Sequence, residues 1–317
     1  MVGYPISHDE LIALIDEHDQ AQRRRKSWKE RSSEALDKLL ADPSKDVPSL
    51  WSEIKPVYAH LQAGKCGFCE RLIGEDDVIS NEQDIEHFRP KKAVNPWPPE
   101  ASVGTDPLPA DIPKSKKGGA GYLRLAFHES NYLVSCKTCN ARFKANYFPI
   151  RSEGHQFEAE DPAPLLSQEK PYLIHPLDEN DDDPETIVGF DGFLAVPVNQ
   201  STRTVAWKRA YVTIHFFGLN DPSRQDQLLL ARARRLMFLG DRLREYEAAP
   251  EAGKAAAWSA VQREYSLKID HAGCVRAAIR LYSAGKRDEV MRAVEAAKIF
   301  YLSKTGMPTD APPPPGP

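Results

Sequence analysis

Apolar residues recur at helical spacing in the N-terminal part of the chain. Leu14 and Ile15 follow Leu11 by three and four residues, which places all three on one face of a helix. Ser7 precedes this stripe and Glu10 follows Ser7 by three residues, a spacing typical of a capping box. We therefore predict a helix that begins directly after Ser7, and helical structure through about residue 62.

Helical spacing returns from about residue 204. Pro222 follows Asn220 and Asp221, and a proline at the first position after such a cap predicts the start of an amphipathic helix. Apolar residues from Leu228 to Leu243 would form its buried face. We expect these apolar faces to form a core, with a docking surface for a partner as the alternative. The pattern predicts three more helices, over residues 251–269, 272–284 and 287–304.

The segment between these two regions carries short apolar runs in place of helical stripes. The runs 122–127 and 132–134 predict strands. Asp191-Gly192 is typical of a hairpin turn, here between two apolar runs within residues 187–196. Residues 140–146 fit a short helix. The whole pattern predicts an α+β protein that is mainly helical.

One stretch in this segment favours neither helix nor strand. Residues 90–121 are rich in proline and end in a cluster of lysines and glycines over residues 114–119. We interpret the stretch as a loop inserted between two strands of a hairpin, with a basic tip. A passive linker is the alternative, since lysines on a loop often serve solubility.

Composition narrows the class of protein. The chain has 317 residues, of which 41% are hydrophobic and 28% are charged, as in a soluble protein with a sizeable core. No apolar run approaches the length of a membrane span, and the first residues lack the pattern of a secretory signal, so we expect a cytoplasmic protein without a membrane anchor. The net charge of −4 is unusual for a protein that binds nucleic acid without a partner, because such binding depends on positive charge.

Two CxxC pairs suggest a metal site. Cys66 and Cys69 form the first pair, and Cys136 and Cys139 form the second. Four thiolates fill the tetrahedral shell of zinc and leave no position for water, so the pattern predicts a structural zinc ion. Disulfides or four buried thiols are the alternative. Cys274 lies in an apolar helical pattern and is expected to be a small buried residue.

An acid precedes a histidine between the two cysteine pairs. Glu86 and His87 lie in the run Asp84-Ile85-Glu86-His87-Phe88-Arg89-Pro90, and Asn140 follows the second pair directly. Carboxylate and amide oxygens suit a hard cation such as Mg²⁺ or Mn²⁺, and a neutral imidazole can accept a proton from water. Together they suit metal-assisted hydrolysis of a phosphodiester. His87 could instead be a core histidine with a structural hydrogen bond.

These residues resemble the HNH endonucleases, whose ββα-metal motif carries an acid–histidine pair on a hairpin and an asparagine on a helix. The resemblance implies that Glu86 is the first metal ligand, His87 the general base and Asn140 the second metal ligand. It also implies that Asn131 braces the loop of the hairpin. Many members have aspartate where this chain has Glu86, which leaves Asp84 as an alternative ligand. The residues that the resemblance implies for binding DNA phosphate are Lys144, Arg89, Lys91 and Arg142.

Within this family the chain is most similar to the HNH nuclease subunits of the Septu (PtuB) and retron-associated anti-phage systems, over roughly residues 50 to 240. The shared pieces include the motifs at 66–70, 85–91 and 131–140. The resemblance implies a DNA-cleaving effector that acts with an ABC/SMC-like ATPase, named PtuA in Septu. A stand-alone restriction or homing nuclease and a non-catalytic zinc-clasped module that binds DNA or a partner are the alternatives.

The resemblance and the composition together predict five regions. These are an N-terminal helical region (1–62), a zinc-clasped nuclease core (63–150), an irregular extension with a hairpin (151–203), a C-terminal helical region (204–305) and a disordered proline-rich tail (306–317).

Overall fold

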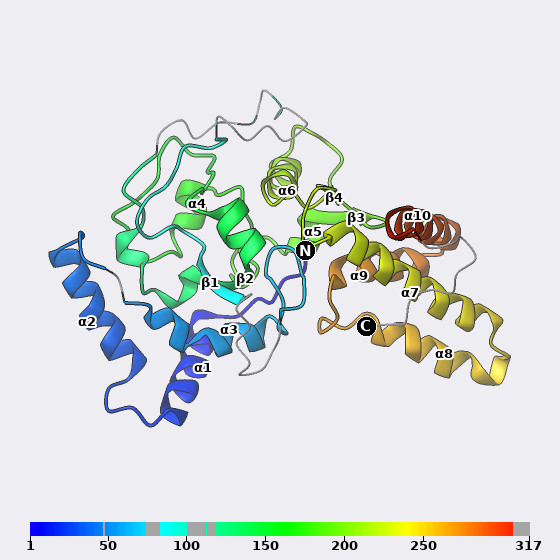
Figure 1. Cartoon of the computed structure of the whole chain (residues 1–317), viewed down its shortest axis with the longest axis horizontal. Coiled ribbons are helices and arrows are strands. Elements are labelled where there is room, and N and C mark those ends of the chain that lie inside the picture. The colour runs from blue at the N-terminus through cyan, green and yellow to red at the C-terminus, as the bar shows by residue number, and fades with distance from the viewer. Residues whose placement is uncertain (47, 74–82, 100–108, 110–111, 113–117, 307–317) are drawn as a thin grey trace. The chain divides into compact units, whose positions relative to one another are not determined.

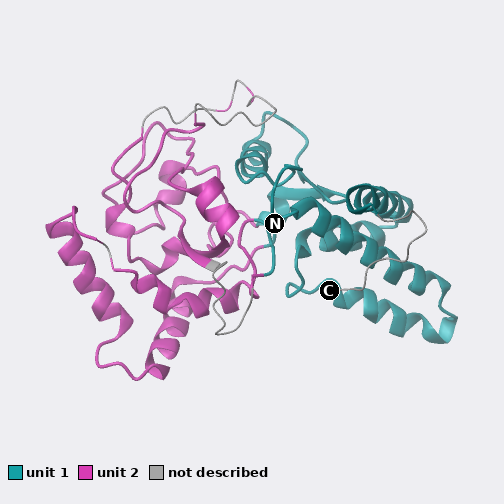
Figure 2. Cartoon of the chain, viewed as in Figure 1, with its two compact units in different colours: residues 1–2, 69–72, 184–317 teal, residues 3–68, 73–183 magenta. Residues whose placement is uncertain are grey.

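The computed structural model describes residues 1–46, 48–73, 83–99, 109, 112 and 118–306. The chain divides into two compact units, which Figure 2 colours separately. We call residues 3–68 and 73–183 the first unit, which is magenta and labelled unit 2 in Figure 2. The second unit, teal and labelled unit 1 there, consists mainly of residues 184–317 together with residues 1–2 and 69–72. The basic tip expected in the loop 90–121 and the tail after residue 306 lie largely outside the described residues.

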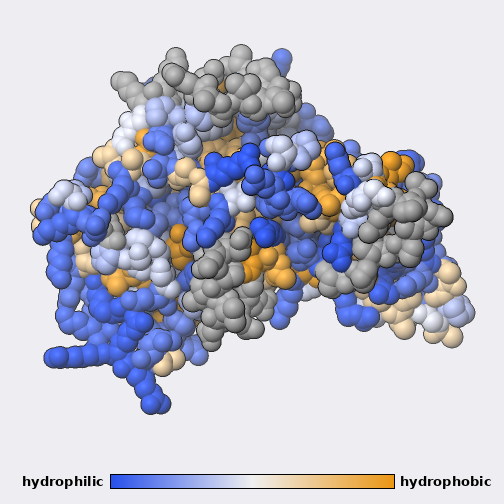
Figure 3. All heavy atoms as spheres, in the orientation of Figure 1, coloured by the Kyte–Doolittle hydropathy of each residue, from blue (hydrophilic) through white to orange (hydrophobic). Residues whose placement is uncertain are grey.

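Helices open the first unit, as the sequence predicts (Figure 1). The helix α1 (His8–Ala21) begins with the expected capping box, in which the Ser7 hydroxyl accepts a hydrogen bond from the Glu10 N–H at 3.3 Å. The other helices of this region are α2 (Trp28–Ala41), η1 (Leu50–Glu53) and α3 (Lys55–Leu61). The basic run 23–26 is exposed between α1 and α2, where Figure 3 shows a largely hydrophilic surface.

A two-stranded antiparallel sheet forms the centre of the first unit. Strand β1 (Gln83–His87) pairs with β2 (Tyr132–Cys136), so that Glu86 lies opposite Leu133. The long insertion between the strands is therefore present as predicted, and its two ends come together where Val94 pairs with Gly119. The predicted strand at 122–127 is wrong.

The segment 122–127 instead contains the short 3-10 helix η2 (Leu123–Leu125). Its buried residues Tyr122, Leu125 and Ala126 recur at the spacing of a helical turn and do not alternate as in a strand with one exposed face. The Leu125 N–H accordingly donates to the Tyr122 carbonyl within the turn. Ala126 and Phe127 then pack against Ala35 and Leu39 of α2.

The remaining elements of the first unit lie directly before β2 or after it in the chain. A further 3-10 turn, η3 (Glu129–Asn131), leads into β2, and the π-helix η4 (Thr138–Lys144) follows it. The predicted helix at 140–146 thus begins two residues earlier and is wider than an α-helix. The short helix α4 (Leu165–Glu169) completes the ordered elements.

The second unit contains the predicted hairpin and a helical bundle. The short helix α5 (Pro184–Ile187) leads into strand β3 (Val188–Asp191), which pairs with β4 (Leu194–Pro197) around the turn that holds Gly192. Gly192 has a φ of +58°, which glycine adopts without strain. Helix α6 (Val205–Phe216) follows.

The long helix of the bundle begins later than the sequence predicts. Helix α7 (Leu228–Ala248) starts six residues after Pro222, because the intervening residues form turns. The Asp221 carboxylate accepts the Ser223 N–H and hydroxyl, so this cap stabilises a tight turn and not a helix. The remaining helices are α8 (Glu251–Arg263), shorter than predicted, α9 (Ala272–Ser283) and α10 (Arg287–Thr305).

Helices α7 to α10 share one hydrophobic core, as their apolar stripes predict. Gly240 of α7 is essential to this packing, since a methyl group there would lie 2.3 Å from Val294 of α10. Cys274 is buried in the same core, which agrees with its predicted role as a small buried residue. Among the described residues, no helix combines the length and apolarity needed to cross a membrane.

Candidate functional site

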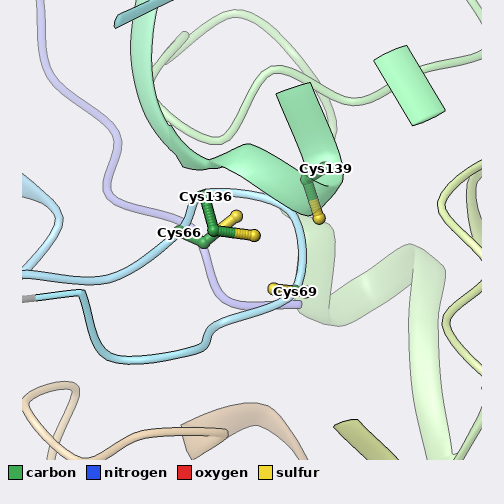
Figure 4. Close-up of side chains that lie close together, drawn as sticks. All are labelled: Cys66, Cys69, Cys136 and Cys139. Atoms are coloured by element: carbon green, nitrogen blue, oxygen red, sulfur yellow. The ribbon is translucent and has the colours of Figure 1, made fainter. Parts of the chain in front are cut away.

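The two CxxC pairs come together. The sulfur atoms of Cys66, Cys69, Cys136 and Cys139 lie within 4.8 Å of one another, and all four side chains are fully buried (Figure 4). A tetrahedral zinc ion with bonds of 2.3 Å would hold its sulfurs about 3.8 Å apart. The cluster is therefore of the right size and chemistry, and it could bind zinc.

A buried glutamine supports the first cysteine pair. The Gln62 side chain accepts the Val134 N–H at 2.7 Å and donates to the Val134 carbonyl at 2.8 Å and the Lys65 carbonyl at 2.9 Å. The Gly67 N–H also donates to the Val134 carbonyl, at 3.0 Å. These bonds tie the turn after α3 to strand β2, which leads into the second pair.

The two candidate catalytic residues are the last two residues of β1. Successive side chains of a strand point to opposite faces, so Asp84 and Glu86 share one face and Ile85 and His87 share the other. Glu86 and His87 are both buried, with exposed fractions of 5% and 6%. Burial and the charges of Lys91 and Lys144 act on both residues.

Glu86 forms a buried ion pair. Its carboxylate lies 3.3 Å from the Lys144 ammonium, which comes from η4 and is fully buried. Burial raises the pKa of Glu86 to about 7, because loss of water outweighs the attraction of Lys144 and Lys91. The nearby Asp84 carboxylate also raises the pKa of Glu86. The carboxylate is therefore poorly compensated and would gain from a further cation.

His87 is held in one tautomer. Its Nε2 lies 3.1 Å from the Ala126 carbonyl, which can only accept, so the proton of the neutral ring is on Nε2. The Tyr132 hydroxyl donates to the same carbonyl at 2.6 Å. Nδ1 then carries the lone pair, and it lies 3.4 Å from the Lys91 ammonium.

Aromatic rings fix the plane of the His87 imidazole. Trp51 of η1 and Tyr132 of β2 contact it edge-on, with ring centroids 4.8 and 5.0 Å away. Burial and the positive charge of Lys91 hold the pKa of His87 well below its ordinary value. The ring is thus neutral and oriented, as a proton acceptor must be.

Asn131 connects the loop after β1 to the start of β2. Its Oδ1 accepts the Arg89 N–H at 2.8 Å, and its Nδ2 donates to the Arg89 carbonyl at 3.0 Å and the Leu125 carbonyl at 3.2 Å. The side chain is fully buried. These contacts tie Arg89, in the loop after β1, to the residues that lead into β2.

A second buried network holds Arg89. Its guanidinium donates to Glu169 of α4 at 3.0 Å, and the Tyr122 hydroxyl donates to the other Glu169 oxygen at 2.6 Å. His155 lies 2.7 Å from the same hydroxyl through Nδ1. Arg89 is only 4% exposed, so its charge is paired with Glu169 inside the unit.

The residues expected to contact DNA are in different environments. Arg142 is exposed on η4, and Lys91 is half-buried over the Trp51 ring at 4.2 Å. Arg89 and Lys144 are buried in ion pairs, so the expectation that they bind phosphate does not fit their positions. Asn140 is half-buried on η4, and among the described residues no hydrogen bond joins it to Glu86 or His87.

Four supporting residues have no role that the sequence predicts, although one of them, Tyr132, lies within the motif at 131–140. They are Gln62, Glu169, Trp51 and Tyr132, which fix the site through the contacts given above. Gln62 and Glu169 are polar residues whose burial depends on partners about 70 to 80 positions away. Trp51 and Tyr132 cannot be told apart in the sequence from the many aromatic residues that only pack in a hydrophobic core.

A comparison with curated proteins found a relative that suggests a function. The chain is similar to the Septu protein PtuB. This relative, from Bacillus mycoides (strain KBAB4), is 35% identical over 127 residues, which cover 40% of this chain and 36% of the relative. The matched part thus spans little more than a third of PtuB. Comparisons with models of protein families and with solved structures found no match.

Proposed function

We propose that this protein is a metal-dependent HNH endonuclease that cleaves DNA within a Septu-type anti-phage defence system. The observation that carries the proposal is a neutral, oriented His87 that directly follows Glu86, with its buried carboxylate, in a hairpin strand. The similarity to PtuB supports the defence setting.

His87 would act as the general base through Nδ1. The Ala126 carbonyl occupies the Nε2 proton, so Nδ1 is the nitrogen able to take a proton from an attacking water. Lys91, which lies beside Nδ1, would have to move or hold a phosphate oxygen when DNA binds. Trp51 and Tyr132 keep the imidazole from rotating away.

Glu86 and Asn140 would hold the catalytic cation, with Asp84 as a supporting ligand. Their oxygens suit Mg²⁺ or Mn²⁺, which when bound polarises the phosphate and screens the leaving oxygen. Asp84 lies on the Glu86 face of β1. Lys144 keeps Glu86 partly ionised until the cation arrives, which makes it a positioning residue and not a DNA contact.

The cysteine cluster would hold a structural zinc ion. Four thiolates would complete its shell, so the ion would contribute to folding and not to hydrolysis. In this arrangement Cys136 ends strand β2, and Cys139 lies in the helix η4, which also carries Asn140. Zinc would thus fix the position of one proposed ligand relative to the hairpin.

DNA contacts are proposed for Arg142 and Lys91, the two candidates whose cations are not committed to buried ion pairs. With a net charge of −4, the chain has little general affinity for phosphate. An ABC/SMC-like ATPase subunit, PtuA-like, would supply the missing affinity for DNA. We place such a complex in the cytoplasm.

A rival function is a zinc-clasped module that binds DNA or a partner without cleaving. The His87→Ala variant separates the two, because a binding module needs no proton acceptor. With the partner and its trigger supplied, cleavage of plasmid DNA should fall by about 10² to 10⁴, the usual effect of losing a general base. His60→Ala, at an exposed position of α3, is the matched control. Unchanged cleavage by His87→Ala would refute the assignment.

A further inference from the structure

A cluster of possible metal ligands lies apart from the catalytic hairpin and the cysteines. His8, at the start of α1, meets His128 and Glu129, at the start of η3, and their ligand atoms lie within 4.8 Å of one another. The two imidazoles stack with centroids 5.4 Å apart. All three residues belong to the first unit.

The distances leave room for an ion. The Glu129 carboxylate lies 3.8 Å from His8 Nε2 and 3.9 Å from His128 Nδ1, beyond hydrogen-bond range. Ligands at 2.0 to 2.2 Å from a tetrahedral ion stand about 3.4 Å apart. The carboxylate would therefore need to approach each imidazole by about 0.5 Å, and the ligand atoms of the two histidines lie within 4.8 Å of each other. His8 is 48% exposed, so its side chain is able to make this movement.

The surroundings of His128 suit metal binding through Nδ1. This nitrogen accepts the Ser130 N–H at 3.2 Å, which shows that it carries the lone pair of the neutral ring. An ion would replace this long hydrogen bond. Burial lowers the pKa of His128, and the charges of His8 and Lys29 act in the same direction, against the attraction of Glu129 and Asp161.

A cavity adjoins the cluster and provides a second, independent observation. It measures about 370 Å³ and is lined by His8, His128 and Asp161 among others. His175 also lines it, is 95% buried, and accepts the Leu177 N–H through Nδ1. Its Nε2 is then a buried donor, and within the described part of the chain it has no hydrogen-bond partner. Such a donor fits an acceptor within the cavity, such as water or an anion on a metal ion.

We propose that His8, His128 and Glu129 form a second metal site, which takes a transition ion of the Zn²⁺, Co²⁺ or Ni²⁺ class. Two imidazoles and one carboxylate favour these ions over Mg²⁺. Three protein ligands leave a position open toward solvent or the cavity. The bound ion would tie α1 to η3, whose last residue is Asn131.

Titration with Ni²⁺ tests the site. The protein is purified without a histidine tag and with its cysteine site loaded with zinc, and Ni²⁺ binding is followed by calorimetry. The unaltered chain should bind one Ni²⁺ at this site. His8→Ala and Glu129→Gln should weaken this binding by at least about 100-fold, since disturbing even the groups around a ligand costs about 10- to 100-fold. Ni²⁺ should also raise the Tm of the unaltered chain but not that of His8→Ala.

Two controls make the result decisive. His60→Ala removes an exposed histidine from α3 and should bind Ni²⁺ like the unaltered protein. His8→Ala decides the case if Glu129→Gln fails to fold, since His8 is exposed and lies at a helix start. Absence of Ni²⁺ binding by the unaltered chain would overturn the proposal. Equal binding by the unaltered chain and His8→Ala would overturn it as well.

Discussion

The buried amide of Asn131 offers the sharpest test of how the hairpin loop is held. Replacing it in Asn131→Ala leaves the Arg89 N–H and the Arg89 carbonyl without the partners described above. The Leu125 carbonyl keeps a second bond from the His128 N–H at 3.3 Å. Two buried groups therefore lose their hydrogen bonds.

The expected cost follows from these two groups. Each buried and unsatisfied backbone group costs about 1 to 3 kcal/mol, so Asn131→Ala should destabilise the first unit by about 2 to 6 kcal/mol. Water that enters the space of the lost side chain would bring the value toward the lower end. Asn131→Asp keeps the volume but turns an oxygen toward two carbonyls, and it should be at least as damaging.

Urea unfolding measures the effect, with circular dichroism and fluorescence followed separately because two units can unfold in two steps. Asn180→Ala, at an exposed position in the same unit, is the control and should change stability by less than about 0.5 kcal/mol. Amide exchange of the peptide around Arg89 should also accelerate in Asn131→Ala. Unchanged stability together with unchanged exchange would refute the bracing role.

Three further predictions concern the metals and the partner. Elemental analysis should find about one zinc per chain, and Cys136→Ser should lose zinc and fail to fold. A chain that is folded and active without zinc would contradict the structural zinc site. Since protons compete with the cation for Glu86, whose pKa is about 7, the Mg²⁺ needed for half-maximal cleavage should be nearly constant above pH 7 and should rise about tenfold per unit below it. Equal requirements at pH 6 and 8 would argue against Glu86 as a ligand. A co-expressed ABC/SMC-like ATPase should co-purify with the chain, whereas full activity of the isolated chain would argue against the partner.

Local signals explain what the sequence predicts well. The capping box at Ser7 involves residues three positions apart, and the turn at Gly192 depends on a conformation that few other residues adopt. The CxxC spacing likewise places two sulfurs in one turn. Each signal involves only a few neighbouring residues, so contacts with distant parts of the chain have little effect on the local structure that it predicts.

Long-range contacts explain what the sequence does not predict. The burial of Arg89 depends on Glu169, and that of Lys144 depends on Glu86, so both basic residues look like DNA contacts until their partners are known. The late start of α7 has a local cause, since the Asp221 side chain caps a turn in a sequence equally suited to a helix. Residue types alone do not tell a buried basic residue from a DNA contact, or a capped turn from the start of a helix.

The Mg²⁺ dependence of DNA cleavage by His87→Ala and Asn140→Ala tests the proposed catalytic site most directly. Both variants are assayed at pH 8 with the partner, its trigger and the same DNA. His87→Ala should lower the maximal rate by about 10² to 10⁴ without changing the Mg²⁺ requirement, because a general base does not bind the cation. Asn140→Ala should shift the curve to higher Mg²⁺. Unaltered rates in both variants, or an unshifted Mg²⁺ curve in Asn140→Ala, would contradict the account.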